Sequence, residues 1–267
     1  MIKTVINGAA GRMGRMLVAE VLATPELQLT GALENPQCPF LGADAGQLAG
    51  LDACGVKITA DFEEALKDAD CIIDFTFAAV TRELAPKVAA KGVAMVIGST
   101  GLSHDDLALL EKLAQNGARI VQSPNMSVGV NLLFALCEQV APLLGEAYDI
   151  EVVEMHHNQK KDAPSGTAEK LGQILSKARG LSYDTDTRHG RQGLVGARTR
   201  NEIGMHSLRG GDVVGDHTVI FATNGERIEL THKASSRQTF AKGAIRAVKF
   251  IAAAQPGKYD MRQVLGI

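Results

Sequence analysis

The chain has 267 residues, and at about 150 residues per domain this length favours two domains with substantial cores. Hydrophobic residues make up 45% of the chain, as in a folded globular protein. The net charge of −2 and the lack of Trp argue against nucleic-acid binding, which needs a basic face and stacking rings. No apolar run approaches the roughly 18 residues of a membrane span, and no leader pattern is found. We therefore expect a cytoplasmic protein with no membrane partner.

The four cysteines are scattered along the chain, at Cys38, Cys54, Cys71 and Cys137. They form no C-x-x-C pair and lie near no second pair of metal ligands. We expect reduced thiols, with neither a disulfide framework nor a zinc site.

The first half of the chain alternates between strand-like and helix-like patterns. Short apolar or β-branched runs occupy residues 3–6, 27–33, 71–75, 93–97 and 119–121. A helix over residues 103–115 is marked by a capping box, Ser103 with Asp106, and by Asn116-Gly117 at its end. Residues 35–55, rich in Gly, Pro and Ala, are expected to form a long loop, either disordered or functional. The alternation is typical of an α/β domain with a parallel sheet.

The pattern changes after Asp149. A strand is expected at 150–155 and a helix at 166–178. Four strand-like runs follow, at residues 195–200, 203–208, 213–222 and 227–232. Gly210-Gly211-Asp212 and Asn224-Gly225 are interpreted as hairpin turns between strands. The region is predicted to be an α+β unit with a largely antiparallel sheet, followed by a last helix over about 236–254.

A Gly-rich turn, Gly8-Ala9-Ala10-Gly11-Arg12-Met13-Gly14, follows the first strand directly and opens a helix. Its glycines allow a tight turn and close approach to a pyrophosphate, which the amides of a helix N-terminus can hold. The spacing G-x-x-G-x-x-G is a weak motif by itself. Glu34, at the end of the second strand, supplies the carboxylate expected at an adenosine ribose. Strand, turn, helix and acid together predict a dinucleotide site.

Glu34 also bears on the choice of cofactor, because a carboxylate there repels a 2′-phosphate. The next residue, Asn35, is not basic. We expect NADH to be used at least as well as NADPH.

Other loops follow predicted parallel strands, where ligands of such sheets bind. Gly98-Ser99-Thr100-Gly101 and Phe75-Thr76 are candidates for the nicotinamide pocket, although each is equally compatible with an ordinary turn. Ser123-Pro124-Asn125-Met126 falls where the two halves meet and is interpreted as a hinge.

The densest polar cluster runs from Glu154 to Thr167 and contains His156, His157 and Lys160. It leaves a strand, crosses a loop and enters a helix at Ser165-Gly166-Thr167, where amides and hydroxyls favour a carboxylate or phosphate. A metal site is disfavoured because neighbouring strand residues point to opposite faces and no third ligand is suitably spaced. The cluster predicts a small anionic substrate and acid–base chemistry from a His or Lys, with no metal.

Over essentially its whole length the chain resembles the 4-hydroxy-tetrahydrodipicolinate reductase family of lysine biosynthesis, also called dihydrodipicolinate reductases. The resemblance is carried by six stretches: GAAGRMGR, VIGSTGL, SPNMSVGVN, EVVEMHHNQKKDAPSGTA, RGGDVVGDHTVIF and ERIELTHKASSRQTFAKGA. It implies a Rossmann-like dinucleotide-binding domain at residues 1–125, completed by 235–267. It further implies an inserted α+β substrate domain at 126–234, whose open mixed sheet assembles a homotetramer.

The resemblance also assigns roles position by position. His156 matches the proton donor and acceptor, Lys160 the second proton donor, and His157, Gly166 and Thr167 the groups that hold the substrate carboxylates. The residues matching the cofactor site are Gly8, Ala9, Ala10, Gly11, Arg12, Met13, Glu34, Gly98, Ser99, Thr100, Ser123, Pro124, Asn125 and Met126. In the family the position after the ribose acid is often basic, so Asn35 departs from it. No role is assigned to Arg209, His217, His232 or Arg237.

The implied reaction is the NADH- or NADPH-dependent reduction of 4-hydroxy-tetrahydrodipicolinate to tetrahydrodipicolinate with loss of water, in the diaminopimelate and lysine pathway. Two alternatives from other classes stay open. An amino-acid dehydrogenase acting on an imine would use the same cationic loop, and a dinucleotide sensor would bind the cofactor without turnover.

Overall fold

The computed structural model describes all 267 residues, which divide into two compact units. The first consists of Met1–Val128 and Gln238–Gly266, and the second of Gly129–Arg237. The chain therefore leaves the first unit, builds the second and returns. These boundaries lie within three residues of the expected ones at 125/126 and 234/235.

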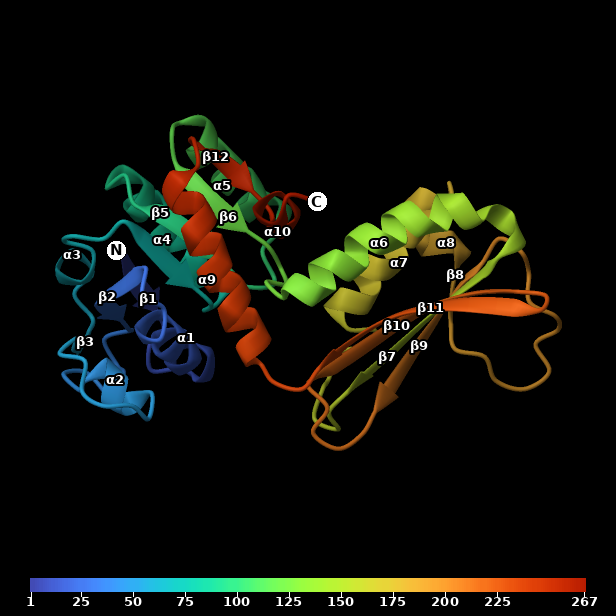
Figure 1. Ribbon diagram of the computed structural model, residues 1–267, viewed down its shortest axis with the longest axis horizontal. Coiled ribbons are helices and arrows are strands. Elements are labelled where there is room, and N and C mark those ends of the chain that lie inside the picture. The colour runs from blue at the N-terminus through green and yellow to red at the C-terminus, as the bar shows by residue number, and fades with distance from the viewer. The chain divides into compact units, whose positions relative to one another are not determined.

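The first unit is a seven-stranded parallel sheet with helices on both faces, in the strand order β12-β6-β5-β4-β1-β2-β3 (Figure 1). Its strands are β1 Ile2–Asn7, β2 Leu27–Leu33, β3 Ile58–Thr59, β4 Cys71–Asp74, β5 Ala94–Ile97, β6 Arg119–Gln122 and β12 Gly257–Tyr259. Its helices are α1 Arg12–Leu22, α2 Ala45–Leu48, α3 Phe62–Ala65, α4 Ala78–Ala90, α5 His104–Gln115, α9 Gln238–Ala253 and α10 Met261–Leu265. The order reverses between β1 and β4, as in dinucleotide-binding folds.

Neighbouring residues of the central strands enter opposite cores, because successive side chains of a strand point to opposite faces. Ile6 and Ile73 pack with α1 and α9, whereas Val5 and Ile72 pack with α4 and α5. The continuous apolar runs of the sequence are thus buried on both sides, which confirms the predicted parallel sheet.

Residues 35–55 are more ordered than the expected long loop. Asp44 caps α2, and its carboxylate accepts hydrogen bonds from the amides of Gly46, Gln47, Cys54 and Gly55. These bonds lower the pKa of Asp44 to about 2, with the Cys54 amide contributing most. The carboxylate of Asp44 thus joins the start of α2 to residues about ten positions further along the chain.

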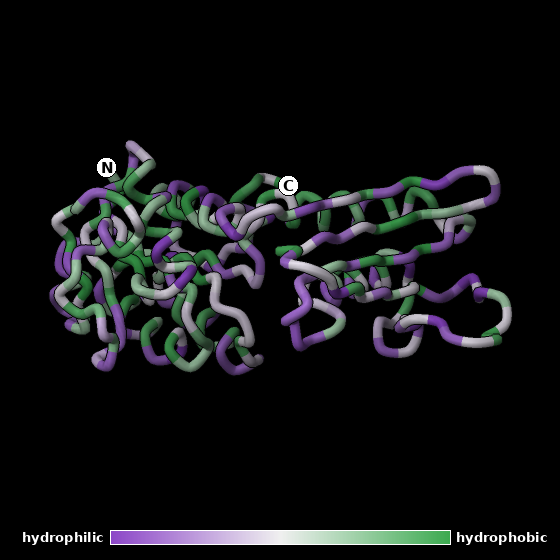
Figure 2. Tube along the Cα trace, turned by 90° about the horizontal axis from the view of Figure 1, so that it is seen from below, coloured by the Kyte–Doolittle hydropathy of each residue, from purple (hydrophilic) through white to green (hydrophobic).

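The second unit packs α6 Val128–Leu144 and α7 Gly166–Ala178 on one face of a five-stranded sheet, and Figure 1 shows no helix on the other face. The strands, in the order β11-β10-β7-β9-β8, are β11 Glu226–Ala234, β10 Gly215–Thr223, β7 Asp149–His156, β9 Ile203–Arg209 and β8 Thr187–His189. The short helix α8 spans Tyr183–Asp186. Buried and half-buried residues alternate along β7, and hydropathy alternates along these strands (Figure 2).

Two predictions for this sheet were wrong. β7 pairs parallel to β9 and antiparallel to β10, so the sheet is mixed, as the family resemblance implies, and not largely antiparallel, as the strand pattern predicts. For the same reason Gly210-Gly211-Asp212 is no hairpin turn, since β7 lies between the strands that it joins. Asn224-Gly225 does join the paired strands β10 and β11.

Residues 195–200, predicted as a strand, form an irregular loop. Gly193 and Gly196 have φ values of 75° and 78°, outside the extended region. The guanidinium of Arg198 binds the carboxylates of Asp149 and Glu151 and the carbonyls of Ile150 and Glu202, and thereby fastens the loop to β7.

The expectation of no apolar run of membrane-spanning length was also wrong. The helical segment Val128–Ala147 has 20 residues and contains an 18-residue window with a mean hydropathy of 1.5, so it is long and apolar enough to cross a bilayer by length and composition. Leu133, Phe134 and Cys137 of this segment lie in the core of the second unit. A helix that packs in the core of a protein can have the same length and apolar composition as a membrane span.

Candidate active site

The residues predicted to hold the cofactor gather at one edge of the first unit's sheet. The Gly-rich turn follows β1, Glu34 follows β2, Phe75-Thr76 follows β4, Gly98-Ser99-Thr100 follows β5, and Ser123 follows β6. All these strands are parallel, so their carboxyl ends share one edge, and the β1/β4 switch in strand order lies at its centre.

The Gly-rich turn is shaped for close backbone approach. A β-carbon added to Gly14 would lie 2.0 Å from the carbonyl oxygen of Gly8, so only glycine permits this packing of α1 on the turn. Gly8 has a φ of +74°, and a β-carbon there would meet Thr76 at 2.7 Å. No side chain caps the N-terminus of α1, where Gly11 is the N-cap residue. The turn therefore fits a pyrophosphate.

Glu34 is fixed beside that turn. Its Oε1 accepts a hydrogen bond of 3.0 Å from the amide of Ala10, and its Oε2 accepts bonds from the amide and side chain of Asn35. Arg15 donates to the carbonyl of Ala10 and lies 5.2 Å from the ring centre of Phe40. A held carboxylate at the end of β2 is the group that accepts hydrogen bonds from ribose hydroxyls.

The loops after β4, β5 and β6 are bound to one another. The amide of Gly98 donates to the carbonyl of Asp74, and a β-carbon on Gly98 would clash with the ring of Phe75 at 2.3 Å. The amide of Ser123 donates to the carbonyl of Ile97, and its hydroxyl to that of Asn125. These contacts hold the loops that follow three adjacent strands.

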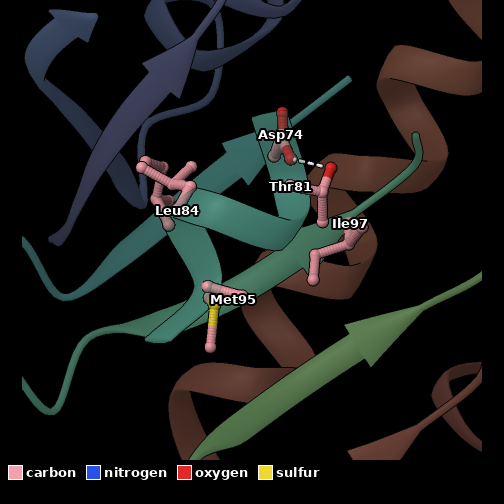
Figure 3. Close-up of a pocket in the computed structure, with 7 residues that line it drawn as sticks. Asp74, Thr81, Leu84, Met95 and Ile97 are labelled. Atoms are coloured by element: carbon pink, nitrogen blue, oxygen red, sulfur yellow. Dashed lines mark hydrogen bonds between the residues drawn. The ribbon is translucent and has the colours of Figure 1, made fainter. Parts of the chain in front are cut away.

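A small cavity lies behind this edge, between β4, β5 and α4 (Figure 3). Its volume is about 10 Å³, enough for at most one water molecule. Thr81 donates a 2.5 Å hydrogen bond to Asp74 at its rim, and Leu84, Met95 and Ile97 form apolar walls. This cavity is too small to be a ligand site.

In the second unit, the polar residues of the predicted site lie at the end of β7. Along β7 the inward positions carry Ile150, Val152, Glu154 and His156, so the last two place polar groups at the end of the core face. Nδ1 of His156 lies 2.6 Å from Oε2 of Glu154, and the two residues are 9% and 1% exposed. Because an ionised carboxylate only accepts, Nδ1–H is the donor.

Burial opposes the ionisation of Glu154, but hydrogen bonds from His156 and Arg209 outweigh it and lower the pKa of the carboxyl to about 2. Arg209, from the end of β9, binds both oxygens of Glu154 at 2.9 Å. The carboxylate is therefore ionised and paired.

The loop between β7 and α7 carries Lys160, whose Nζ lies 2.9 Å from Oδ2 of Asp162. Arg209 also donates to the carbonyl of Asp162, at 2.7 Å. Ser165 is the N-cap of α7 and accepts a hydrogen bond from the amide of Ala168. Gly166, the first helical residue, is exposed, with open space around its β-carbon position. This end of α7 fits a carboxylate.

His217 on β10 completes the cluster. Its Nε2 lies 3.1 Å from Oγ of Ser165, and its ring contacts that of His156 edge-on, with 5.2 Å between centres. Burial, reinforced by the charge of His156, lowers the pKa of His217 to about 3. His217 faces His232 across the β10/β11 ladder, and a β-carbon on Gly129 would touch the ring of His232.

The structure thus brings together His156, Lys160 and the Ser165-Gly166-Thr167 helix start in one unit, and the Gly-rich turn, Glu34 and the loops after β5 and β6 in the other. The prediction assigns no role to three residues of this cluster: Glu154, Arg209 and His217. A signal existed for Glu154, since a carboxylate at an inward position of an alternating strand requires partners.

No group of three or more His, Cys, Asp or Glu side chains is placed to hold a metal ion. The second unit's cluster offers a carboxylate-bound imidazole, an ammonium and an open helix N-terminus. Such a set can bind an anion and move protons.

Known proteins with similar sequences cover the whole chain. A reductase of Syntrophotalea carbinolica, called 4-hydroxy-tetrahydrodipicolinate reductase, is 49% identical over 267 residues and 100% of both chains. A protein of the same name from Anaeromyxobacter sp. is 50% identical over 269 residues, covering 100% of this chain and 98% of its own.

Among solved structures, dipicolinate-bound dihydrodipicolinate reductase from Paenisporosarcina sp. has the same fold, with a TM-score of 0.78, 24% identity and 97% coverage of both chains. Residues 2–126 match the sequence family described as dihydrodipicolinate reductase, N-terminus, and residues 129–265 match the family described as dihydrodipicolinate reductase, C-terminus. The chain therefore belongs to the dihydrodipicolinate reductase family.

Proposed function

We propose that this protein is an oxidoreductase that reduces 4-hydroxy-tetrahydrodipicolinate to tetrahydrodipicolinate, with loss of water, in diaminopimelate and lysine biosynthesis. The proposal rests above all on one observation: the second unit places His156, Lys160 and an open helix N-terminus around a single loop. Full-length relatives that carry this activity in their names support it.

The first unit binds a nicotinamide cofactor. Gly8 to Met13 hold the pyrophosphate and Glu34 the adenosine ribose, in keeping with the glycine-limited turn and the fixed carboxylate. The loops at Gly98, Ser99 and Thr100 and at Ser123, Pro124, Asn125 and Met126 line the nicotinamide side. When bound, the cofactor supplies the reducing hydride.

The second unit binds the dicarboxylate substrate. His157, Gly166 and Thr167 hold its carboxylates, supported by the exposed Gly166 at the start of α7 and the cationic loop before it. Reduction pushes electron density through the conjugated ring, so proton donors are needed. His156 donates from Nε2, because Nδ1 is engaged by Glu154, and Lys160 donates from Nζ.

NADH serves at least as well as NADPH in this proposal. Glu34 is held in place by Ala10 and Asn35 and cannot easily withdraw from a 2′-phosphate. A preference for NADPH of more than about tenfold in kcat/KM, equal to ~1.4 kcal/mol, contradicts this choice of cofactor but not the proposed reaction.

The test is a coupled assay in which pyruvate and aspartate semialdehyde are condensed in situ, while oxidation of NADH and of NADPH is followed separately. Turnover with either cofactor supports the reductase. Cofactor binding without turnover overturns it and favours a sensor, and turnover only with an amino acid and its imine favours a dehydrogenase of that class.

His156→Ala and Lys160→Ala are each expected to lower kcat by about 100-fold or more, the usual range for a general acid, while changing the Kd of NADH less than threefold. Calorimetric titration with NADH separates the two effects. Unchanged kcat in either variant removes that residue from the mechanism.

The protein is further proposed to be a cytoplasmic homotetramer that needs no metal. The helix-free face of the second unit's sheet carries apolar side chains, Val153, Met155, Leu208 and Ile220, and Leu208 is 49% exposed. Such a face suits contact with other copies. Sedimentation as a monomer near 28.3 kDa contradicts the tetramer.

A further inference from the structure

Glu154 occupies an unusual position for a charged side chain, because it is 1% exposed on the core-facing side of β7. A buried carboxylate is costly unless its oxygens are fully engaged. Here Oε1 accepts from Arg209 and from the amide of Ser165, and Oε2 accepts from Arg209 and from Nδ1 of His156. Each oxygen therefore has two donors.

Each of these donors belongs to a different part of the proposed site. His156 is the proposed proton donor, and the bond to Glu154 keeps the proton of the neutral imidazole on Nδ1, which directs Nε2 away from the carboxylate. The amide of Ser165 begins α7, the proposed carboxylate site. Arg209 continues to the carbonyl of Asp162, whose side chain pairs with Lys160.

The imidazole of His156 is confined on its other side as well. A β-carbon added at Gly215 would lie 2.9 Å from Nε2, and the ring of His217 contacts it edge-on. The ring therefore has little room to turn, and the bond to Glu154 determines which nitrogen faces which way.

We propose that Glu154, clamped by Arg209, is a positioning residue that fixes the orientation and tautomer of His156 and at the same time anchors the Lys160 loop and the start of α7. This inference rests on the proposed function for its kinetic consequences. Neither Glu154 nor Arg209 needs to touch the substrate, because both act through the groups that they hold.

The same strand supplies a matched control. Glu151, on the opposite face of β7, binds Arg191, Arg198 and His206, so it too is an ionised glutamate held by arginines and a histidine. Its side chain contacts no residue of the proposed site. Glu151→Gln therefore makes the same chemical change in the same strand and reports the cost of losing an ion-pair cluster on the face proposed to contact other copies, away from the proposed site.

The experiment compares Glu154→Gln with Glu151→Gln in the full-length protein. For Glu154→Gln we expect kcat to fall at least about 10- to 100-fold, the loss typical when the outer hydrogen-bond partner of a functional histidine ligand is removed, with the Kd of NADH changed less than threefold. For Glu151→Gln we expect kcat within about threefold of the parent. Equal losses in both variants, or none in Glu154→Gln, overturn the proposal.

The pH dependence of kcat gives a readout that a purely structural role does not move. The groups facing His156 are Glu154 on β7, Arg209 on β9, His217 on β10, and the Lys160–Asp162 pair on the loop. Glu154→Gln removes the one carboxylate in direct contact with His156, so its pH profile of kcat is expected to differ from that of the parent, whereas Glu151→Gln is expected to leave the profile unchanged. An unchanged profile in both variants argues against the proposal.

A third readout does not depend on activity. In protein labelled with 15N-histidine, with His156 assigned through His156→Gln, the nitrogen shifts report the tautomer. Nδ1–H is expected in the parent and a mixture in Glu154→Gln. If the parent shows no turnover but this change occurs, the proposed function fails and the positioning role stands, whereas an unchanged tautomer overturns it.

Arg209→Lys is the second variant, in case Glu154→Gln does not fold. Lysine keeps the charge but cannot bind both carboxylate oxygens and the carbonyl of Asp162 together. We expect a smaller loss of kcat, about 3- to 30-fold, with NADH binding unchanged. A kcat equal to that of the parent overturns the role of the clamp.

Discussion

His217 shows how a single buried side chain can link the site to stability. It is 4% exposed, and its Nε2 contacts the hydroxyl of Ser165, the N-cap of α7. Burial and the neighbouring His156 lower its pKa to about 3, although Glu154 acts in the opposite sense. The imidazole is therefore neutral at physiological pH and acts as a packing and hydrogen-bonding group.

The depressed pKa of His217 makes stability depend on pH. In the unfolded chain the imidazole takes up a proton near its ordinary pKa of about 6.5, whereas in the folded protein it does not, so stability is lost as pH falls below about 6.5. Between pH 7 and pH 5 this loss amounts to about 2 kcal/mol. His217→Gln, which keeps a donor for Ser165, is expected to remove that part of the slope.

Urea unfolding followed by circular dichroism at both pH values measures this slope. The groups near His217 are His156, Glu154, His232 and Lys160, and all of them stay in the variant. If the free energy of unfolding depends equally on pH in parent and variant, the prediction that His217 is neutral in the folded protein is wrong.

At the scale of the element, α5 shows what a capping box contributes once tertiary contacts are added. The hydroxyl of Ser103 accepts from the amide of Asp106, and Asp106 accepts from the amide of Ser103, as the sequence predicts. The structure adds Arg82 of α4, whose guanidinium binds both oxygens of Asp106. Chiefly through Arg82, the pKa of Asp106 lies far below its ordinary value.

The α5 cap leads to a graded prediction. Ser103→Ala is expected to cost about 1 kcal/mol, an ordinary cap loss, and Asp106→Ala is expected to cost more, because it removes the hydrogen bond to the Ser103 amide as well as the pair with Arg82. Asp105→Ala is the matched control, since Asp105 lies in the same first turn without these partners, and it is expected to cost under about 0.5 kcal/mol. Thermal unfolding ranks the three, and a cost of Asp106→Ala no larger than that of Asp105→Ala contradicts the argument.

At the scale of the whole molecule, the first unit is discontinuous in sequence. Its core includes Ala244, Val248 and Ile251 of α9 and Val264 of α10, and β12 pairs with β6 at the sheet edge. α9 also passes so close to the end of the first segment that a β-carbon on Gly243 would meet the carbonyl of Met126 at 1.7 Å. The last thirty or so residues of the chain therefore belong to the fold of the first unit.

Shortening the chain tests this dependence. A chain that ends at Arg237 loses α9, β12 and α10 and is expected to lose the cooperative unfolding of the first unit together with cofactor binding. A chain that ends at Pro256 keeps α9 and is expected to fold with reduced stability. Calorimetric scans with and without NADH distinguish the two, and retained NADH binding in the shorter chain contradicts the prediction.

The sequence by itself determined the elements whose signals are local. The runs of β-branched residues, the Gly-rich turn, the capping box at Ser103 and the Asn224-Gly225 turn each depend on a few neighbouring residues, and the structure has each of them. The motifs around His156 and Lys160 also identified the family, because they are specific over a short stretch.

Only the tertiary structure decided which strands pair and which side chains meet. β9 and β10 are adjacent in sequence but lie on opposite sides of β7, and the strand-like segment at 195–200 is held as a loop by Arg198, about 50 residues from its partners Asp149 and Glu151. Arg209 meets Glu154 across 55 residues. Such pairs depend on sheet order and burial, which are properties of the folded chain, so no local pattern contains them.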